Sequence, residues 1–276
     1  MTAKYDVFVE DIEYLKVGEA SLLARLYRPK GDGPFPGVVE VHGGAWTGND
    51  RLTNVDIDQA LAASGVVVMA IDFRMPPAAQ YPEPVADINF AIRWLRANAE
   101  RFAVEQAKIG LLGTSSGGHQ GLLATMRSTD SRYMAHGDAG TDDASIAYAA
   151  ICWAVADPLA RYHMVKDKGI DRLVEAHHAY WPDEGAMDEG SPQRMLERGE
   201  DLTLPPLLSV QGTEDDNLTP NMATHFADAY SAAGGEVQLE IFEGAPHAFV
   251  AKDPASSDSI RAIGLIIDFV RAQTAR

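Results

Sequence analysis

Short apolar runs alternate along most of the chain with longer segments whose apolar residues recur every three or four positions. The short runs have strand length, and several are apolar throughout, which is typical of strands buried on both faces of a parallel sheet. The longer segments carry one apolar face, as helices that pack on a sheet do. We therefore predict an α/β fold with a mostly parallel, eight-stranded sheet and helices on both faces. The predicted strands are 6–17, 21–28, 37–41, 66–73, 109–112, 148–155, 207–211 and 237–242.

The first two predicted strands are joined by a turn at Gly18 and Glu19, so we expect them to form an antiparallel pair at one edge. The regular alternation stops over residues 156–200, where short helical pieces carry clustered His, Tyr and Trp. We interpret this segment as a cap-like insertion into a single domain that spans residues 1–276. Helices are predicted over 52–64, 85–95, 119–126, 221–233 and 256–272.

The stretch Gly113-Thr114-Ser115-Ser116-Gly117-Gly118 lies between a predicted strand and a predicted helix. Strand, sharp turn and helix form the context of a nucleophile elbow, in which small residues must stand two positions either side of the apex. Ser115 meets that spacing on both sides, whereas Ser116 follows the bulkier Thr114 by two. The alternative is a Gly/Ser turn that holds a phosphate at the helix N-terminus, although the P-loop lysine is missing.

A serine becomes nucleophilic when a histidine takes its proton and an acid orients that histidine. Asp215 follows the strand 207–211, and His247 follows the strand 237–242, so both belong to the same sheet edge as Ser115. The order Ser115, Asp215, His247 is the order of α/β-hydrolases. Asp216 is the second choice for the acid. His119 is a rival base, but we expect it on the helix surface.

His42-Gly43-Gly44-Ala45-Trp46 follows the third predicted strand, where an oxyanion loop belongs. We predict that the N–H groups of Gly43, Gly44 and Ser116 form the oxyanion hole. A tight turn at the end of a strand would explain the two glycines alone, but not their position after this strand.

The net charge of −17 opposes binding to nucleic acid and to anionic membranes, and it favours a neutral substrate. The N-terminal residues include acids where a signal peptide has an apolar core, so we expect a cytoplasmic protein. No apolar run reaches the length of a membrane span. Cys152 is the single cysteine and lies in an apolar run, which predicts a buried thiol. The sequence shows no His-Glu-x-x-His motif or cysteine cluster that would predict a metal site.

These motifs resemble the α/β-hydrolase superfamily and, within it, the hormone-sensitive-lipase-like esterases, over nearly the whole chain. The stretch Asp72-Phe73-Arg74-Met75-Pro76-Pro77, followed by Tyr81-Pro82 and Asp87, is similar to the Asp-Tyr-Arg-Leu-Ala-Pro region of that branch. Ala45 replaces the usual third glycine of the oxyanion loop. The resulting His-Gly-Gly-x-Trp form is similar to acetylesterases, feruloyl-esterase-like hydrolases and kynurenine formamidase.

The resemblance implies a serine carboxylesterase that hydrolyses small neutral acyl esters through an acyl-enzyme, with no metal or organic cofactor. Its partner would be a small-molecule ester, and the oligomeric state stays open, with a homodimer as one option. An arylformamidase or amidase is the alternative, followed by a lactonase, a peptidase and a non-catalytic binding protein on the same scaffold. The residues predicted to bind substrate are Trp46, Tyr180 and Trp181, and further pocket or cap candidates are Trp153, His163, His177 and His178.

Overall fold

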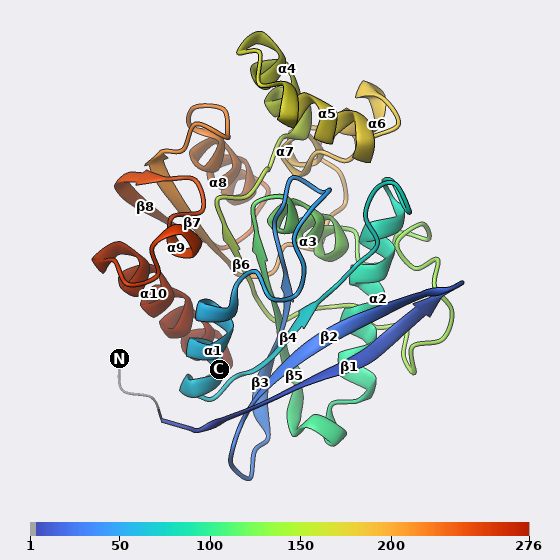
Figure 1. Ribbon diagram of the computed structural model, residues 1–276, viewed down its shortest axis with the longest axis vertical. Helices are drawn as coiled ribbons and strands as arrows, with labels where there is room; N and C mark the ends of the chain where they lie inside the picture. Colours follow the sequence, from blue (N-terminus) through green and yellow to red (C-terminus); the bar gives the residue numbers. More distant parts are fainter. Residues whose placement is uncertain (1–3, 276) are drawn as a thin grey trace.

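A computed structural model describes residues 4–275, and its centre is one eight-stranded sheet (Figure 1). The strands lie side by side in the order β1-β2-β4-β3-β5-β6-β7-β8. This arrangement confirms the predicted eight-stranded, mostly parallel sheet. The strands are β1 (Val7–Val17), β2 (Ala20–Pro29), β3 (Phe35–Val41), β4 (Val67–Ile71), β5 (Val104–Thr114), β6 (Ala149–Cys152), β7 (Leu207–Glu214) and β8 (Val237–Pro246).

Two neighbouring pairs of strands are antiparallel, and the rest of the sheet is parallel. β1 pairs with β2 as the sequence predicts, and β2 also pairs antiparallel with β4. From β4 to β8 every neighbouring pair runs parallel, and Val39 of β3 lies between Met69 and Leu111. Because parallel strands end at the same edge, the loops after β3, β5, β7 and β8 are brought to one side of the sheet.

Helices cover both faces of the sheet and divide the core into two layers. Apolar side chains of α2 (Glu83–Ala97), α3 (Ser116–Met126) and α8 (Met222–Ala232) pack on one face. Those of α1 (Val55–Ser64) and α10 (Ser257–Thr274) pack on the other. Two short elements complete these layers, η1 (Glu100–Phe102) and α9 (Phe249–Lys252). No helix among residues 4–275 has both the length and the apolar character needed to cross a membrane.

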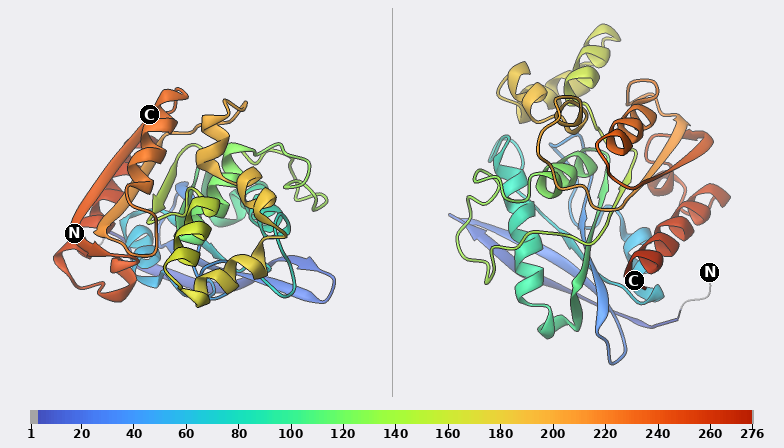
Figure 2. Two further views of the ribbon diagram at one scale, coloured as in Figure 1. Left: turned by 90° about the horizontal axis from the view of Figure 1, so that it is seen from above. Right: turned by 180° about the vertical axis from the view of Figure 1, so that it is seen from behind.

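Four short helices fill the segment between β6 and β7 and lie beyond the carboxyl ends of the central strands (Figure 1). Side-chain caps set where three of them begin, since Asp157, Asp183 and Ser191 each accept a hydrogen bond from a backbone N–H of the first turn. Seen from above in Figure 2, the segment crosses over the end of the sheet. These helices are α4 (Pro158–Asp167), α5 (Asp171–Tyr180), α6 (Glu184–Glu189) and α7 (Pro192–Glu197).

Candidate active site

Ser115 stands at the apex of the turn between β5 and α3, in a strained backbone conformation with φ 52° and ψ −120°. The flanking glycines are required by close packing. A Cβ atom on Gly117 would lie 2.1 Å from the carbonyl oxygen of Val41, and one on Gly113 would lie 2.7 Å from the Cα of Gly118. The spacing that the sequence shows around Ser115 therefore has a steric cause, and it lets the chain turn sharply at the hydroxyl.

The three residues predicted as a triad form one chain of hydrogen bonds. Ser115 Oγ lies 2.9 Å from His247 Nε2, and His247 Nδ1 lies 2.7 Å from Asp215 Oδ2. Because the Asp215 carboxylate accepts from Nδ1, that nitrogen carries the proton and Nε2 is left to accept from Ser115. Asp216 is exposed, so the geometry favours Asp215 over the neighbouring acid.

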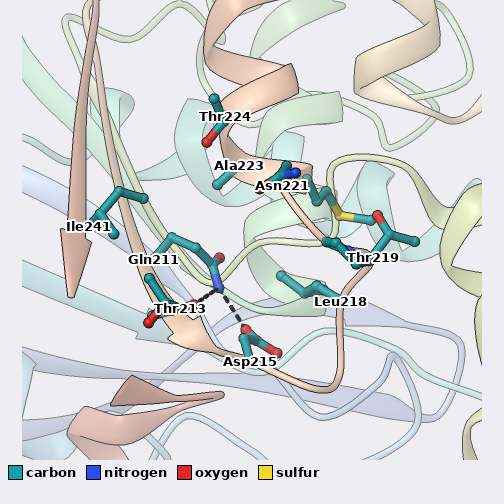
Figure 3. Close-up of a pocket in the computed structure, with 12 residues that line it drawn as sticks. Gln211, Thr213, Asp215, Leu218, Thr219, Asn221, Ala223, Thr224 and Ile241 are labelled. Carbon is teal, nitrogen blue, oxygen red and sulfur yellow. Dashed lines mark hydrogen bonds between the residues drawn. The ribbon is translucent and has the colours of Figure 1, made fainter. Parts of the chain in front are cut away.

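Hydrogen bonds from three directions hold Asp215 ionised. Burial on its own would raise the pKa of this carboxyl, but the bonds from His247, from Gln211 and from the backbone N–H of Asn217 together lower it. Gln211 Nε2 lies 2.9 Å from Asp215 Oδ2, a contact drawn in Figure 3. Both residues line a hollow with a volume of about 170 Å³. That hollow is lined by Asp215 but not by Ser115 or His247, so it lies behind the acid rather than at the nucleophile.

The oxyanion loop after β3 differs from the prediction at Gly43. The N–H of Gly43 donates to Thr114 Oγ1 at 3.0 Å, so this donor is already occupied. Gly43 must nevertheless be a glycine, because its Cβ would lie 2.9 Å from the Cβ of Ser115. Within the described part of the chain, the N–H groups of Gly44 and Ala45 have no hydrogen-bond partner. The first N–H of α3, that of Ser116, has no acceptor within its helix.

A series of hydrogen-bonded, buried polar side chains holds this loop, and no sequence motif predicts it. Asn54 Nδ2 donates to Glu40 Oε1 at 2.6 Å and to Thr114 Oγ1 at 3.1 Å. Thr114 in turn accepts from Gly43. Burial raises the pKa of Glu40 to about 8, and burial together with Glu40 raises the pKa of Asp58 well above its usual value. Burial therefore favours the protonated form of both carboxyls.

The aromatic residues predicted to bind substrate are buried where the 156–200 segment packs on the oxyanion loop. Trp46, Tyr180 and Trp181 are at most 2% exposed. Trp46 stacks on Tyr180 with 5.3 Å between ring centroids, and it meets Trp181 edge-on at 5.9 Å. None of the three lines the cavity at Ser115, so the prediction for them is corrected: their rings anchor the cap on the oxyanion loop. Trp153 does line that cavity.

The rival base and the cysteine have no role at the nucleophile. His119 was expected on the helix surface, but it is fully buried. Its Nδ1 accepts from Trp46 Nε1 at 3.1 Å, and its Nε2 donates to the carbonyl of Gly190 at 2.8 Å. Burial lowers its pKa to about 4, so the ring is neutral and both nitrogens are used. Cys152 is buried as predicted, and burial raises the pKa of its thiol to about 12.

A cavity of about 330 Å³ opens directly at Ser115 and His247. It is lined by the oxyanion loop, by Asn217 in the loop after β7 and by Arg172 of α5. The site thus combines a hydroxyl bonded to a histidine, free backbone donors and room for a small ligand, an arrangement that suits acyl transfer.

The chain is similar in sequence to a known family and to a known esterase. The family model described as BD-FAE matches residues 25–230. Esterase LipC from Mycobacterium tuberculosis is 29% identical over 256 residues, which are 88% of this chain and 61% of that protein. This chain therefore spans less than two thirds of the length of that relative.

Solved structures share the fold. An esterase from the archaeon Pyrobaculum calidifontis superposes with a TM-score of 0.80 at 22% identity, covering 99% of this chain and 88% of the other. A propionate-bound esterase from Thermogutta terrifontis gives a TM-score of 0.75 at 25% identity, covering 98% and 94% of the two chains.

Proposed function

Since the chain belongs to the BD-FAE family and has the α/β-hydrolase fold, we propose that it is a serine carboxylesterase that hydrolyses esters of small acyl groups. The observation that carries the proposal is the continuous hydrogen-bonded chain Ser115–His247–Asp215. The Ser115 hydroxyl faces a cavity, which leaves it accessible to an ester carbonyl.

In the proposed reaction, Ser115 Oγ attacks the ester carbonyl while His247 Nε2 takes its proton. Asp215 stabilises the imidazolium that forms. The N–H groups of Gly44 and Ser116 donate to the oxyanion, and the adjacent N–H of Ala45 is free to join them. His247 then gives its proton to the departing alcohol, leaving an acyl-enzyme on Ser115. Water attacks this ester with His247 again as base, which releases the acid and restores the serine.

Two observations support a small acyl group. The cavity at Ser115 has a volume of about 330 Å³ and is bounded by the cap helix α5. The Thermogutta terrifontis relative was solved with propionate bound, a three-carbon acid. A short acyl chain therefore suits this site better than a long lipid chain.

Replacing the nucleophile tests the proposal. We expect Ser115→Ala to lower kcat for 4-nitrophenyl acetate by about 10⁴-fold or more, because the whole acyl-transfer step depends on this hydroxyl. Ser231→Ala removes an exposed hydroxyl of α8 and is the matched control, with activity unchanged. Full turnover by pure Ser115→Ala protein would overturn the assignment.

An amide hydrolase of the arylformamidase type is the second candidate, because the loop from His42 to Trp46 resembles that of kynurenine formamidase. Parallel assays with N-formylkynurenine and 4-nitrophenyl acetate separate the two. A kcat/KM that is higher for the formamide would favour the second candidate.

A further inference from the structure

The cavity at Ser115 has polar walls, and nearly all of its polar side chains already bond to the protein. Asn54 and Thr114 belong to the chain that ends at Glu40. The others are bonded as well: Asn49 donates to the carbonyl of Gly43, Thr53 donates to the carbonyl of Asp50, and Asn217 accepts from Arg161. These bonds hold the side chains in place, and among the described residues the amide nitrogen of Asn217 and the amide oxygen of Asn49 keep all of their hydrogen-bonding capacity.

Arg172 is the exception. It is exposed at the second position of α5, it lines the cavity, and it has no hydrogen bond, ion pair or ring contact within residues 4–275. Every other arginine in that range contacts a carboxylate, a carbonyl or an aromatic ring, including the cavity's neighbour Arg161. A guanidinium is always charged and carries five donors, so Arg172 offers a complete set to whatever enters the cavity.

A second cation, Arg161, lies close enough to Arg172 for their charges to interact. Arg161 is fully buried, and its Nη1 has no hydrogen-bond partner in the described part of the chain. Burial, together with the positive charge of Arg172, lowers its pKa to about 10, although Asp215 acts in the opposite direction. Two like charges near each other repel, and a bound anion would relieve that repulsion. The free donors of Arg172 and its cationic neighbour thus both favour a negative group in the cavity.

We propose that the ester substrate carries a carboxylate, which Arg172 binds while the ester carbonyl lies at Ser115. This inference rests on the proposed function. A planar guanidinium matches a carboxylate through two parallel hydrogen bonds, and one cation on the cavity wall matches one negative charge. The net charge of −17 favours neutral substrates only at long range, because salt screens exposed charges beyond roughly 8 Å. At contact distance the charge of Arg172 outweighs the distant net charge. A substrate with a carboxylate is therefore favoured over the neutral substrate that the sequence predicts.

Pairs of esters that differ only in a carboxylate and its neutral amide test the proposal. Monomethyl glutarate carries the carboxylate on the acyl side, and methyl 4-carbamoylbutanoate is its neutral amide. 4-Acetoxybenzoate carries the carboxylate on the alcohol side, and 4-acetoxybenzamide is its neutral amide. For at least one pair, we expect kcat/KM of the wild-type protein to favour the carboxylate. Arg172→Gln should reduce that preference about ten-fold or more, because a charge-assisted bond is lost. Arg172→Lys should keep part of it, and added salt should weaken it.

Lys168→Gln is the matched control, since it removes an exposed cation of the cap that does not line the cavity. Its preference should equal that of the wild-type protein. If the wild-type protein hydrolyses 4-nitrophenyl acetate but prefers neither carboxylate, or if Arg172→Gln leaves the preference unchanged, the inference is wrong and the esterase proposal stands. If the wild-type protein hydrolyses no ester at all, both proposals are wrong.

Discussion

Glu40 should make the stability of this protein fall as the pH rises. The carboxyl is fully buried, Oε1 accepts from Asn54, and Oε2 has no partner in the described part of the chain. Burial raises its pKa from 4.5, the ordinary value for a glutamate in water, to about 8 in the folded protein. Between these two values the folded protein keeps a proton that the unfolded chain loses. The stability from this proton is complete below the unfolded pKa and is lost as pH rises through the folded pKa.

Glu40→Gln removes this titration while keeping the shape and the carbonyl that accepts from Asn54. The wild-type free energy of unfolding should lose up to about 1.4 kcal/mol for each pH unit from this one proton. The variant should therefore gain stability relative to the wild type, by roughly 2 to 3 kcal/mol between about pH 5.5 and about pH 7.5. Asp58 remains buried in both proteins, so the effect of burial on its pKa is common to them, and only the part that is due to Glu40 is lost in the variant.

Urea unfolding followed by tryptophan fluorescence at several pH values measures this difference. Glu19→Gln, in the exposed turn between β1 and β2, is the matched control and should show no such trend. A stability difference between Glu40→Gln and the wild type that stays constant across this pH range would refute the reasoning.

Three further substitutions test how the site is positioned. Asp215→Asn should lower kcat by about 10⁴-fold in steady-state assays, because an amide nitrogen facing His247 Nδ1 favours the wrong tautomer; a fall of less than ten-fold would contradict the orienting role. Thr114→Val should lower kcat with little change in KM, since it removes the acceptor that holds the Gly43 N–H. Thr114→Ser keeps the hydroxyl and should have a kcat close to that of the wild type. Equal effects of both variants would contradict the role of the hydroxyl. Gly117→Ala should lower Tm by several degrees in calorimetry, because its Cβ would overlap the carbonyl oxygen of Val41; an unchanged Tm would contradict the steric account.

Local patterns predict the elements and the order of the reacting groups. The apolar runs that become β3, β4 and β5 have few polar residues because both faces of the sheet are covered. Gly113 and Gly117 mark the elbow by their spacing around Ser115, although the atoms that exclude a Cβ on Gly117 belong to the distant Val41 and His42. Ser115 and His247 follow parallel strands, and this alone brings them to one sheet edge.

Other features depend on contacts between distant segments, and these have no local pattern. Glu40 stands between Val39 and Val41 in β3, and no neighbouring residue in the sequence indicates that Asn54 will bond to it. Trp46, as an aromatic residue in a catalytic motif, suggested a substrate contact, but the cap folds over the ring and removes it from the cavity.

The sequence by itself determined the sheet, the elbow and the three side chains of the proposed triad, because periodicity and glycine spacing are visible in the local sequence. Only the tertiary structure decided which backbone N–H groups stay free, which aromatic rings are covered and which arginine is left without a partner. Those outcomes depend on how residues far apart in the chain use up one another's donors, acceptors and exposed surface.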